Sequence, residues 1–296
     1  MAGSYEGLSQ TFANMEKVKI MKRLTVTILS AILALASMNA LAGDKATIAV
    51  IGTGDLGGSL GVMLGKAGYT IVYGSRDPSR DAAKKLVEQS GEGASVTTQQ
   101  EAAQAADIIL LAVPWPPIEQ IAQNIGDLEN KIVVSLAWPY QVGEDGYLES
   151  GVETSIAEMI QAWHPEAKVL MAGMPGAFLI DDPGAMGDPP TVSIAGDDRE
   201  AKEMVVRLTA DLGLVPFDAG PTRHSRYIEA MAMLYMVPLS QGREEGLEIY
   251  LHRSSYWPCN WDATADYGKV SDSEDLAELP PRATPPIPCS EQLIWE

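Results

Sequence analysis

A glycine-rich segment near the start of the chain carries the first residues whose spacing could do chemistry. It follows an apolar run directly and contains, in order, Gly52, Thr53, Gly54, Asp55, Leu56 and Gly57. In such a segment Gly52 allows a tight turn, Gly54 lets the backbone approach a pyrophosphate, and Gly57 lets a helix pack closely on a strand. Free N–H groups at the start of that helix would meet the phosphate charge. The pattern predicts a dinucleotide-binding turn because a strand precedes it and a helix follows it.

A second polar group follows the next apolar run, where the sequence reads Ser75 and Arg76, with Arg80 close behind. A carboxylate at this point would accept hydrogen bonds from the ribose hydroxyls of NAD, but it would repel a 2′-phosphate. An arginine can bind a phosphate through a bidentate, charge-assisted fork. Each such bond contributes about 1.5–3 kcal/mol. The group predicts NADPH as the nucleotide; an exposed arginine in an ordinary turn is the alternative interpretation.

These groups need elements to position them, and the surrounding pattern indicates a parallel sheet. Four runs rich in Val and Ile are continuous rather than alternating, as strands buried on both faces should be; they cover 46–51, 70–73, 108–113 and 132–136. Amphipathic stretches lie between them. We expect the second helix to have Asp77 as its N-cap and to end at Gly91. The alternation predicts an α/β protein with a Rossmann-like, doubly wound parallel sheet.

The rest of the chain continues this pattern more loosely. Further strands are expected at 169–171, 191–195 and 214–217, and helices at 199–212 and 222–251. We therefore predict an NADP-binding Rossmann domain over 43–198. A C-terminal helical part is predicted over 199–257, and the family resemblance given below implies that it completes an acceptor cleft and forms a dimer contact. Residues 258–296 are acidic, rich in proline and without periodicity, so a disordered tail is predicted there.

Composition excludes several classes of function. The formal charge of −19 argues against a nucleic-acid partner, whose phosphates would be repelled. The two cysteines, Cys259 and Cys289, lie near no CxxC or histidine cluster, so no metal site is predicted. Whether they form a disulfide depends on the compartment. No Ser-His-Asp or Cys-His arrangement is recognisable, so no catalytic nucleophile is predicted.

The N-terminus has the pattern of an export signal. Residues 1–20 precede a second methionine, Met21, and 21–42 combine basic residues, an apolar stretch and a small-residue cleavage pattern. We expect cleavage before Gly43, a periplasmic or secreted location, and no stable membrane insertion after cleavage. A cytoplasmic protein or a retained inner-membrane anchor are the alternatives. The nucleotide is chiefly cytoplasmic, which conflicts with export.

Three segments together resemble a known family. The stretch from Ile51 to Pro78 is similar to the NADP-binding domain of deazaflavin-dependent NADP reductases and to the cytosolic domain of the Steap metalloreductases. Leu111 to Trp115 is a second match. Phe217 to Pro221 followed by His224 to Glu229 resembles the pattern that opens the family's C-terminal helix. The resemblance covers about residues 45–253.

This resemblance implies hydride transfer between NADPH and a flavin or deazaflavin, in a homodimer. It places Thr53 and Leu56 at the pyrophosphate and Ser75, Arg76 and Arg80 at the 2′-phosphate. It also places Val113, Pro114, Trp115 and Ala137 along the nucleotide. Trp138, Met174 and Pro175 would line the acceptor side. Because the cofactor and the acceptor carry the chemistry, the protein would mainly position two rings.

Two departures leave the acceptor open. The family commonly has an Asp and an Asn-Pro pattern where this chain reads Ser135 to Pro139, and the loop 181–188 has no match. A ferric or cupric reductase is therefore a rival within the same class. A protein that binds NADPH without turnover is a rival from another class. Oxidation of NADPH with added acceptors would separate the three.

Overall fold

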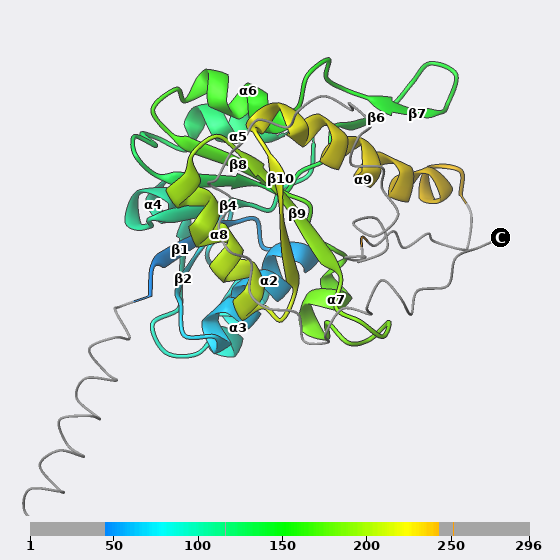
Figure 1. The fold of residues 1–296 in the computed structure, drawn as a ribbon. Helices are drawn as coiled ribbons and strands as arrows, with labels where there is room; N and C mark the ends of the chain where they lie inside the picture. The colour runs from blue at the N-terminus through cyan, green and yellow to red at the C-terminus, as the bar shows by residue number, and fades with distance from the viewer. Residues whose placement is uncertain (1–44, 116, 243–250, 252–296) are drawn as a thin grey trace, which may run out of the picture. The chain divides into compact units, whose positions relative to one another are not determined.

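The computed structural model describes residues 45–115, 117–242 and 251. Its helices and strands belong to the compact unit that begins at Ala46. An eight-stranded sheet forms its centre, in the order β10-β9-β8-β5-β4-β1-β2-β3 (Figure 1). The strands are β1 (Thr47–Ile51), β2 (Thr70–Ser75), β3 (Ser95–Thr98), β4 (Ile108–Leu111), β5 (Ile132–Ser135), β8 (Lys168–Ala172), β9 (Thr191–Gly196) and β10 (Val215–Gly220).

Helices cover both faces of the sheet (Figure 1). One face carries α2 (Asp55–Lys66), α3 (Asp81–Ser90), α7 (Ala177–Asp181) and α8 (Arg199–Asp211). The other carries α4 (Gln99–Ala105), α5 (Ile118–Asn124) and α6 (Ile156–Trp163), together with the 3-10 turn η1 (Thr222–His224) and α9 (Ser225–Ser240). The predicted Rossmann-like α/β architecture is confirmed.

The core consists of two apolar layers, one on each face of the sheet, because every central strand is buried on both sides. Ile48 and Val50 of β1 face the layer that α2 and α8 complete, whereas Ala49 and Ile51 face the layer of α4, α5 and α6. This double burial explains why the strands read as continuous apolar runs.

The turn from α2 into β2 shows how local sequence ends a helix. Gly68 has a φ of +92°, a conformation that glycine adopts without steric cost. Its N–H bonds the carbonyl of Gly65 at 2.9 Å, and the N–H of Tyr69 bonds the carbonyl of Leu64 at 3.1 Å. This paired arrangement satisfies the last carbonyls of the helix.

The sheet is mostly parallel, with one reversal. Strands β3, β2, β1, β4, β5 and β8 run in one direction, but β9 pairs antiparallel with β8, and β10 is parallel to β9. The start of β9 therefore lies at the edge where β8 ends, and the N–H of Gly173 bonds the carbonyl of Ser193 at 2.9 Å. The sequence did not predict this reversal.

Three strands were also missed. The short, polar β3 closes one side of the sheet, and β6 (Tyr140–Val142) pairs with β7 (Leu148–Ser150) in a separate hairpin. These three strands are polar and partly exposed, so they lack the continuous apolar run that marks β4 and β5, which are no longer than β3. The last strand, β10, lies in the segment 199–257 yet belongs to the main sheet.

Two predicted helix boundaries were wrong. The second helix begins at Asp81 rather than after Asp77, because the Asp77 carboxylate accepts the N–H of Ser79 at 3.0 Å and its hydroxyl at 2.5 Å within a preceding turn. The helix expected over 222–251 has a 3-10 turn at its start and ends at Ser240 within the described residues. Leu251 pairs with Thr191 in an isolated bridge.

Several predictions fall outside the described residues: the signal over 21–42, the tail over 258–296, and the state of Cys259 and Cys289. Within the described ranges, no helix has the length and hydropathy needed to cross a membrane. The same ranges contain no group of three or more potential metal-ligating side chains.

Candidate functional site

The loops after β1, β2 and β4 meet at one edge of the sheet. The N–H of Gly52, after β1, bonds the carbonyl of Gly74 in β2 at 3.2 Å. The N–H of Ala112, after β4, bonds the carbonyl of Ile51 at 2.9 Å. These bonds fix the glycine loop against both neighbouring strands at their carboxyl ends, where ligands bind in open α/β sheets.

The three glycines of the loop have different surroundings. Gly52 has a φ of +117°, and a Cβ there would overlap the carbonyl oxygen of Ala112. A Cβ on Gly57 would overlap the carbonyl oxygen of Gly52. At Gly54, by contrast, a Cβ would meet nothing within 4 Å. Two of the glycines therefore serve the fold, whereas the third leaves open space beside an exposed backbone.

The start of α2 is suited to an anion. Gly54 is its N-cap and forms no side-chain capping bond. The first N–H groups of a helix have no partner within the helix, and their aligned dipoles favour negative charge. An uncapped helix start beside open space fits a pyrophosphate group.

The predicted 2′-phosphate residues divide into a structural group and two exposed cations. The Ser75 hydroxyl is buried, donates to the carbonyl of Asp77 at 3.0 Å and accepts the N–H of Asp77 at 3.2 Å, so it holds the turn after β2. Arg76 is exposed. Arg80 is exposed and donates to the Thr53 hydroxyl at 3.4 Å, which brings it to the glycine loop. The residues present fit a phosphorylated dinucleotide.

The remaining cofactor predictions lie along the same edge. Val113 packs beside Gly52, since a Cβ on that glycine would lie 3.1 Å from its Cγ1 atom. Pro114 is exposed and Ala137, after β5, is buried. Trp115 packs closely against Gly151, whose Cβ would lie 3.2 Å from the ring atom Cε2. Contact of these residues with the nucleotide stays a prediction.

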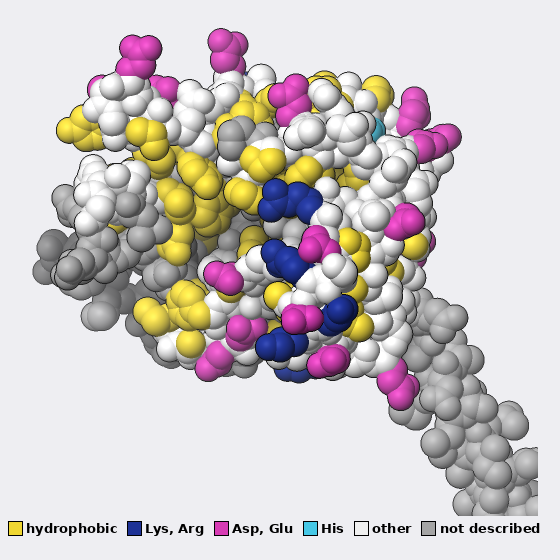
Figure 2. Space-filling view, turned by 180° about the vertical axis from the view of Figure 1, so that it is seen from behind, with side chains coloured by type: hydrophobic (Ala, Val, Ile, Leu, Met, Phe, Trp, Pro, Cys, Tyr) yellow, Lys and Arg dark blue, Asp and Glu magenta, His cyan; other side chains and the backbone are white. Residues whose placement is uncertain are grey.

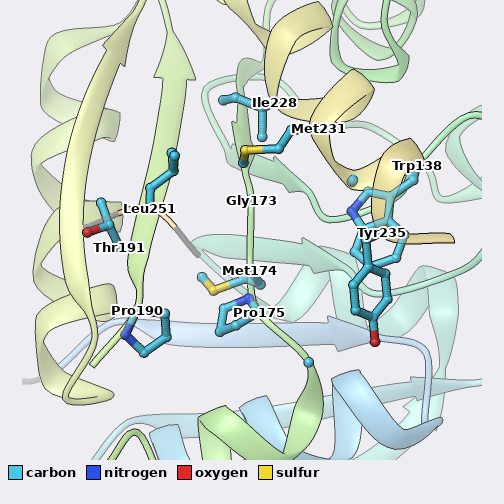
Figure 3. Close-up of a pocket in the computed structure, with 12 residues that line it drawn as sticks. Trp138, Gly173, Met174, Pro175, Pro190, Thr191, Ile228, Met231, Tyr235 and Leu251 are labelled. Atoms are coloured by element: carbon cyan, nitrogen blue, oxygen red, sulfur yellow. The ribbon is translucent and has the colours of Figure 1, made fainter. Parts of the chain in front are cut away.

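The three predicted acceptor residues line one pocket. Trp138 follows β5, and Met174 and Pro175 follow β8 (Figure 3). Figure 3 shows Trp138 and Tyr235 on one side of this hollow and Pro190, Thr191 and Leu251 on the other, with residues of α9 above. The hollow encloses about 560 Å³, including the space at its mouth. We call it the acceptor pocket.

Aromatic and aliphatic side chains form most of the wall of the acceptor pocket. The rings of Trp138 and Tyr235 pack edge to face, with centroids 5.6 Å apart and planes at 73°. Ile228 and Met231 of α9 lie nearby. Such a surface suits a planar, apolar ring rather than a charged group.

Helix α9 is anchored to α6 by the last residues of the third matched segment. The buried Glu229 carboxylate accepts the N–H of Ile156 at 3.0 and 3.1 Å, and that of Ala157 at 3.4 Å. Burial raises the pKa of Glu229 to about 8, although these N–H donors act to lower it. Arg226 donates to both Glu158 oxygens at 2.7 Å. That ion pair and the hydroxyl of Ser155, the N-cap residue of α6, hold the pKa of Glu158 below its usual value.

In the sequence, the α9 residues of the joint between α6 and α9 are visible only as a motif. An arginine and an acid spaced along one helix give no signal about which distant groups they contact. The same holds for His224, whose Nδ1 bonds the carbonyl of Ala219 at 2.6 Å, and for Asp218, which accepts from Lys202 at 3.0 Å. The structure thus gives these motif residues structural partners.

The fold and the loop together define a Rossmann-type dinucleotide-binding protein. Comparison with known proteins narrows this class. Residues 47–139 match the family described as NADP oxidoreductase, coenzyme F420-dependent. The chain is 32% identical over 204 residues to the F420-dependent NADP reductase of Methanocaldococcus jannaschii, a match that covers 63% of this chain and 89% of the relative.

Two further comparisons agree. A crystal structure of an Arthrobacter protein assigned as an F420-dependent NADP reductase superposes with a TM-score of 0.62 at 25% identity, covering 70% of this chain and all of the other. Metalloreductase STEAP3 of Rattus norvegicus is 27% identical over 186 residues, but the match spans only 36% of its length. The chain belongs to the coenzyme F420-dependent NADP oxidoreductase family, and it is an NADP-dependent oxidoreductase.

Proposed function

We propose that this protein transfers hydride between NADPH and a flavin-type or deazaflavin-type acceptor. One observation carries the proposal: Trp138, Met174 and Pro175 gather with residues of α9 in an apolar pocket. This pocket lies at the same edge of the sheet as the glycine loop. A flat redox ring is the ligand that such a wall would hold best.

The sheet explains why two sites can cooperate. Strands β1, β4, β5 and β8 are consecutive neighbours and parallel, so their carboxyl ends share one edge. The glycine loop follows β1, Trp138 follows β5, and Met174 follows β8. A nucleotide held at one end of this edge and a ring held at the other can meet between them.

Each side of the site has a distinct task. NADPH, when bound, supplies a hydride. The start of α2 and the two exposed arginines would hold its phosphates. Trp138 and Tyr235 would orient the acceptor ring, and the apolar wall would exclude water. Within the described lining no carboxylate, imidazole or amine is present, so the protein's part is positioning.

The names of the relatives support a deazaflavin as acceptor, since both reductases cited above are described as F420-dependent. Similarity to a metalloreductase is weaker and covers about a third of that protein. The pocket contains no described metal-ligating cluster. We therefore favour the organic ring over the metal chelate as the electron acceptor.

An acceptor screen on the full chain tests the proposal. NADPH oxidation would be followed with 5-deazariboflavin, riboflavin or a ferric chelate as acceptor. Reduction of 5-deazariboflavin supports hydride transfer, because this ring accepts electrons as a pair. Reduction of the ferric chelate alone would instead make the protein a metalloreductase. Tight NADPH binding without oxidation by any acceptor would favour a sensor.

A variant of the pocket links activity to the site. Trp138→Leu removes the ring but keeps an apolar side chain, so we expect the KM for the acceptor to rise by about tenfold. The KM for NADPH should stay within about twofold of the original value, since the phosphate-binding elements are untouched. Equal effects on both constants would contradict the assignment of Trp138 to the acceptor side.

A further inference from the structure

We propose that the phenolic hydroxyl of Tyr235 is a catalytic hydrogen-bond donor, which stabilises the negative charge that develops on the acceptor ring as the ring receives the hydride. This inference rests on the proposed function and adds one chemical group to it. Three observations carry it: the composition of the pocket wall, the order of the strands, and the packing that holds the Tyr235 ring.

The proposed reaction creates a charge inside the acceptor pocket. A neutral ring that accepts a hydride, which is two electrons and one proton, becomes an anion, while NADPH becomes NADP⁺. The reduced ring then takes one further proton from water. Aliphatic and aromatic side chains form most of the wall, and a charge in such surroundings is costly unless a hydrogen-bond donor meets it. A donor at the ring lowers the barrier, because it binds the charged transition state more strongly than the neutral ring.

This donor has to be a neutral group. Among the described residues that line the pocket, no side chain is a lysine, arginine or histidine. On the face drawn in Figure 2, hydrophobic side chains likewise gather beside a column of Lys and Arg rather than among it. The charge on the ring is therefore left to hydroxyl or indole groups of the wall.

Three side chains of the described lining can donate a hydrogen bond: Trp138, Thr191 and Tyr235. A phenol has a pKa of about 10, whereas an indole or an alcohol does not titrate in the range of protein side chains. A more acidic O–H or N–H group forms the stronger hydrogen bond to an anion. Chemistry alone therefore favours the hydroxyl of Tyr235.

The order of the strands favours the same side of the pocket. The sheet reads β9-β8-β5-β4-β1 across the site, so Trp138, after β5, lies two strands closer to the glycine loop than Thr191, at the start of β9. Tyr235 packs against Trp138, and Figure 3 shows both across the hollow from Thr191. A hydride that comes from the nucleotide side would thus enter beside Trp138 and Tyr235.

Packing fixes the Tyr235 ring at this place. Ile228, Met231 and Tyr235 recur along α9 at spacings of three and four residues, so they share the helix face that lines the pocket. The Trp138 ring meets the Tyr235 ring edge to face, with centroids 5.6 Å apart. Figure 3 shows the Tyr235 hydroxyl at the end of the hollow away from Ile228 and Met231. A donor on a ring held in this way needs little reorganisation when charge develops.

Tyr235→Phe tests the inference, because it removes the hydroxyl and keeps the ring that packs on Trp138. We expect the rate of hydride transfer from NADPH to 5-deazariboflavin to fall by about 10- to 100-fold, the usual loss for a hydrogen bond to a charged group. Single-turnover absorbance measurements on the full-length protein give this rate, and NADPH deuterated at the transferred position identifies the step. The dissociation constants of NADPH and 5-deazariboflavin should stay within about threefold of the original values.

Binding of the two oxidation states gives a readout that needs no turnover. In mildly alkaline solution 1,5-dihydro-5-deazariboflavin is an anion, whereas the oxidised ring is neutral. In anaerobic calorimetry without NADPH, Tyr235→Phe should weaken binding of the reduced ring by about tenfold and that of the oxidised ring by less than about threefold. A side chain that only fills the wall would affect both forms equally.

Tyr227→Phe is the matched control, because it removes the same hydroxyl from the same helix. Tyr227 is 73% exposed and lies outside the described lining of the pocket. The rate and both affinities should stay within about twofold of the original values. Trp138→Phe removes the rival donor; a loss of rate in this variant with none in Tyr235→Phe would assign the task to the indole and overturn the inference.

The remaining outcomes separate the inference from the proposed function. A hydride-transfer rate of Tyr235→Phe within about twofold of the original would overturn the inference and leave the proposed function intact. Equal weakening of the oxidised and reduced rings would also overturn it, since Tyr235 would then act through packing alone. Absence of hydride transfer in the original protein would contradict the proposed function and, with it, the role of Tyr235.

Discussion

Gly54 and Gly57 belong to one loop, but a side chain at these two positions would have different surroundings. Gly57 is buried under the carbonyl of Gly52, so its missing side chain serves packing. Gly54 is exposed, with a φ of −86° that any residue adopts and with empty space where a Cβ would lie. No neighbouring atom excludes a side chain there, so the fold leaves room for a ligand beside this backbone.

This contrast gives a paired prediction. Gly54→Ala should change the free energy of unfolding by less than about 1 kcal/mol, yet weaken NADPH binding by about tenfold or more because a methyl group fills the ligand's space. Gly57→Ala should lower the free energy of unfolding by about 1–3 kcal/mol. Urea unfolding and calorimetric titration with NADPH measure both. Unchanged NADPH affinity in Gly54→Ala would place the pyrophosphate elsewhere.

Choice of nucleotide belongs to a neighbouring residue, Arg76. Arg76→Ala removes an exposed guanidinium without a cost in packing, so stability should stay nearly constant. The preference for NADPH over NADH should shrink by about tenfold or more, as measured by the ratio of dissociation constants. Lys85→Ala removes the same charge from the exposed face of α3 and should leave that ratio intact. A similar loss of NADPH preference in both variants would show that the overall surface charge, rather than Arg76 itself, sets the preference.

Residue identities could be predicted where they are local in sequence. The glycine loop and Arg76 are recognisable because a strand and a helix flank them within a few residues. The partners of Ser75 and Glu229 could not be predicted, since the first bonds its own turn and the second bonds N–H groups of a helix 73 residues away. Hydrogen bonding across such separations depends on packing that no sequence pattern records.

At the scale of elements, the joint between α6 and α9 holds the helix that supplies part of the pocket wall. Helix α9 contributes Ile228, Met231 and Tyr235 to the wall, and Glu229 ties this helix to the start of α6. The tie is unusual because burial raises the pKa of Glu229 to about 8. Between these two pKa values the folded protein keeps the Glu229 proton, whereas the unfolded chain, in which this pKa has its ordinary value of 4.5, has released it.

Stability should consequently depend on pH through this joint. Because the folded state binds more protons between about pH 4.5 and 8, the free energy of unfolding should fall as pH rises through this window and level off above it. Glu229→Gln cannot titrate, so its stability should decline less over the same range. Thermal unfolding at several pH values measures this. Glu153→Gln, at an exposed acid, should behave like the original protein. Parallel curves for Glu229→Gln and the original protein would refute the linkage.

Strands could be predicted in proportion to their burial. The continuous apolar runs of β1, β4 and β5 are buried on both faces, and their pattern is unmistakable. Strand direction has no such signature, so the antiparallel pairing of β9 was invisible. The start of α3 was misplaced because Asp77 can cap a turn as well as a helix, and the turn formed instead.

At the scale of the whole molecule, α9 carries a stripe of apolar side chains that is exposed on the described surface. Tyr227, Ala230 and Leu234 of α9 are exposed and recur at helical spacing; the first and last are 73% and 56% exposed. An amphipathic helix normally buries such a stripe. We expect a second copy of this chain to cover it, which agrees with the homodimer that the sequence resemblance predicts.

Leu234→Asp tests this expectation. An acid in the centre of the stripe should convert the dimer to a monomer at micromolar concentrations, as measured by light scattering after size-exclusion chromatography. Met186→Asp, at another exposed apolar residue outside α9, should leave the mass unchanged. A monomer before any substitution would exclude the predicted assembly.

The predicted export of the chain concerns residues outside those described, and it stays a prediction. Its consequence for function is direct, because an oxidoreductase that uses NADPH needs the nucleotide in its own compartment. Fractionation of cells that produce the full chain would locate it and show whether 21–42 is removed.

The reversed strand β9 has a consequence for how acceptor preference could change. In a parallel crossover the connecting segment leaves one edge of a sheet and re-enters at the opposite one. Here the connection from Gly173 to Pro190 leaves and returns at the same edge, since β8 and β9 are antiparallel. Because α7 within this connection packs against α2, and Leu179 and Ile180 are buried, a change in its length or sequence would act together on the pocket wall and on the helix that follows the glycine loop.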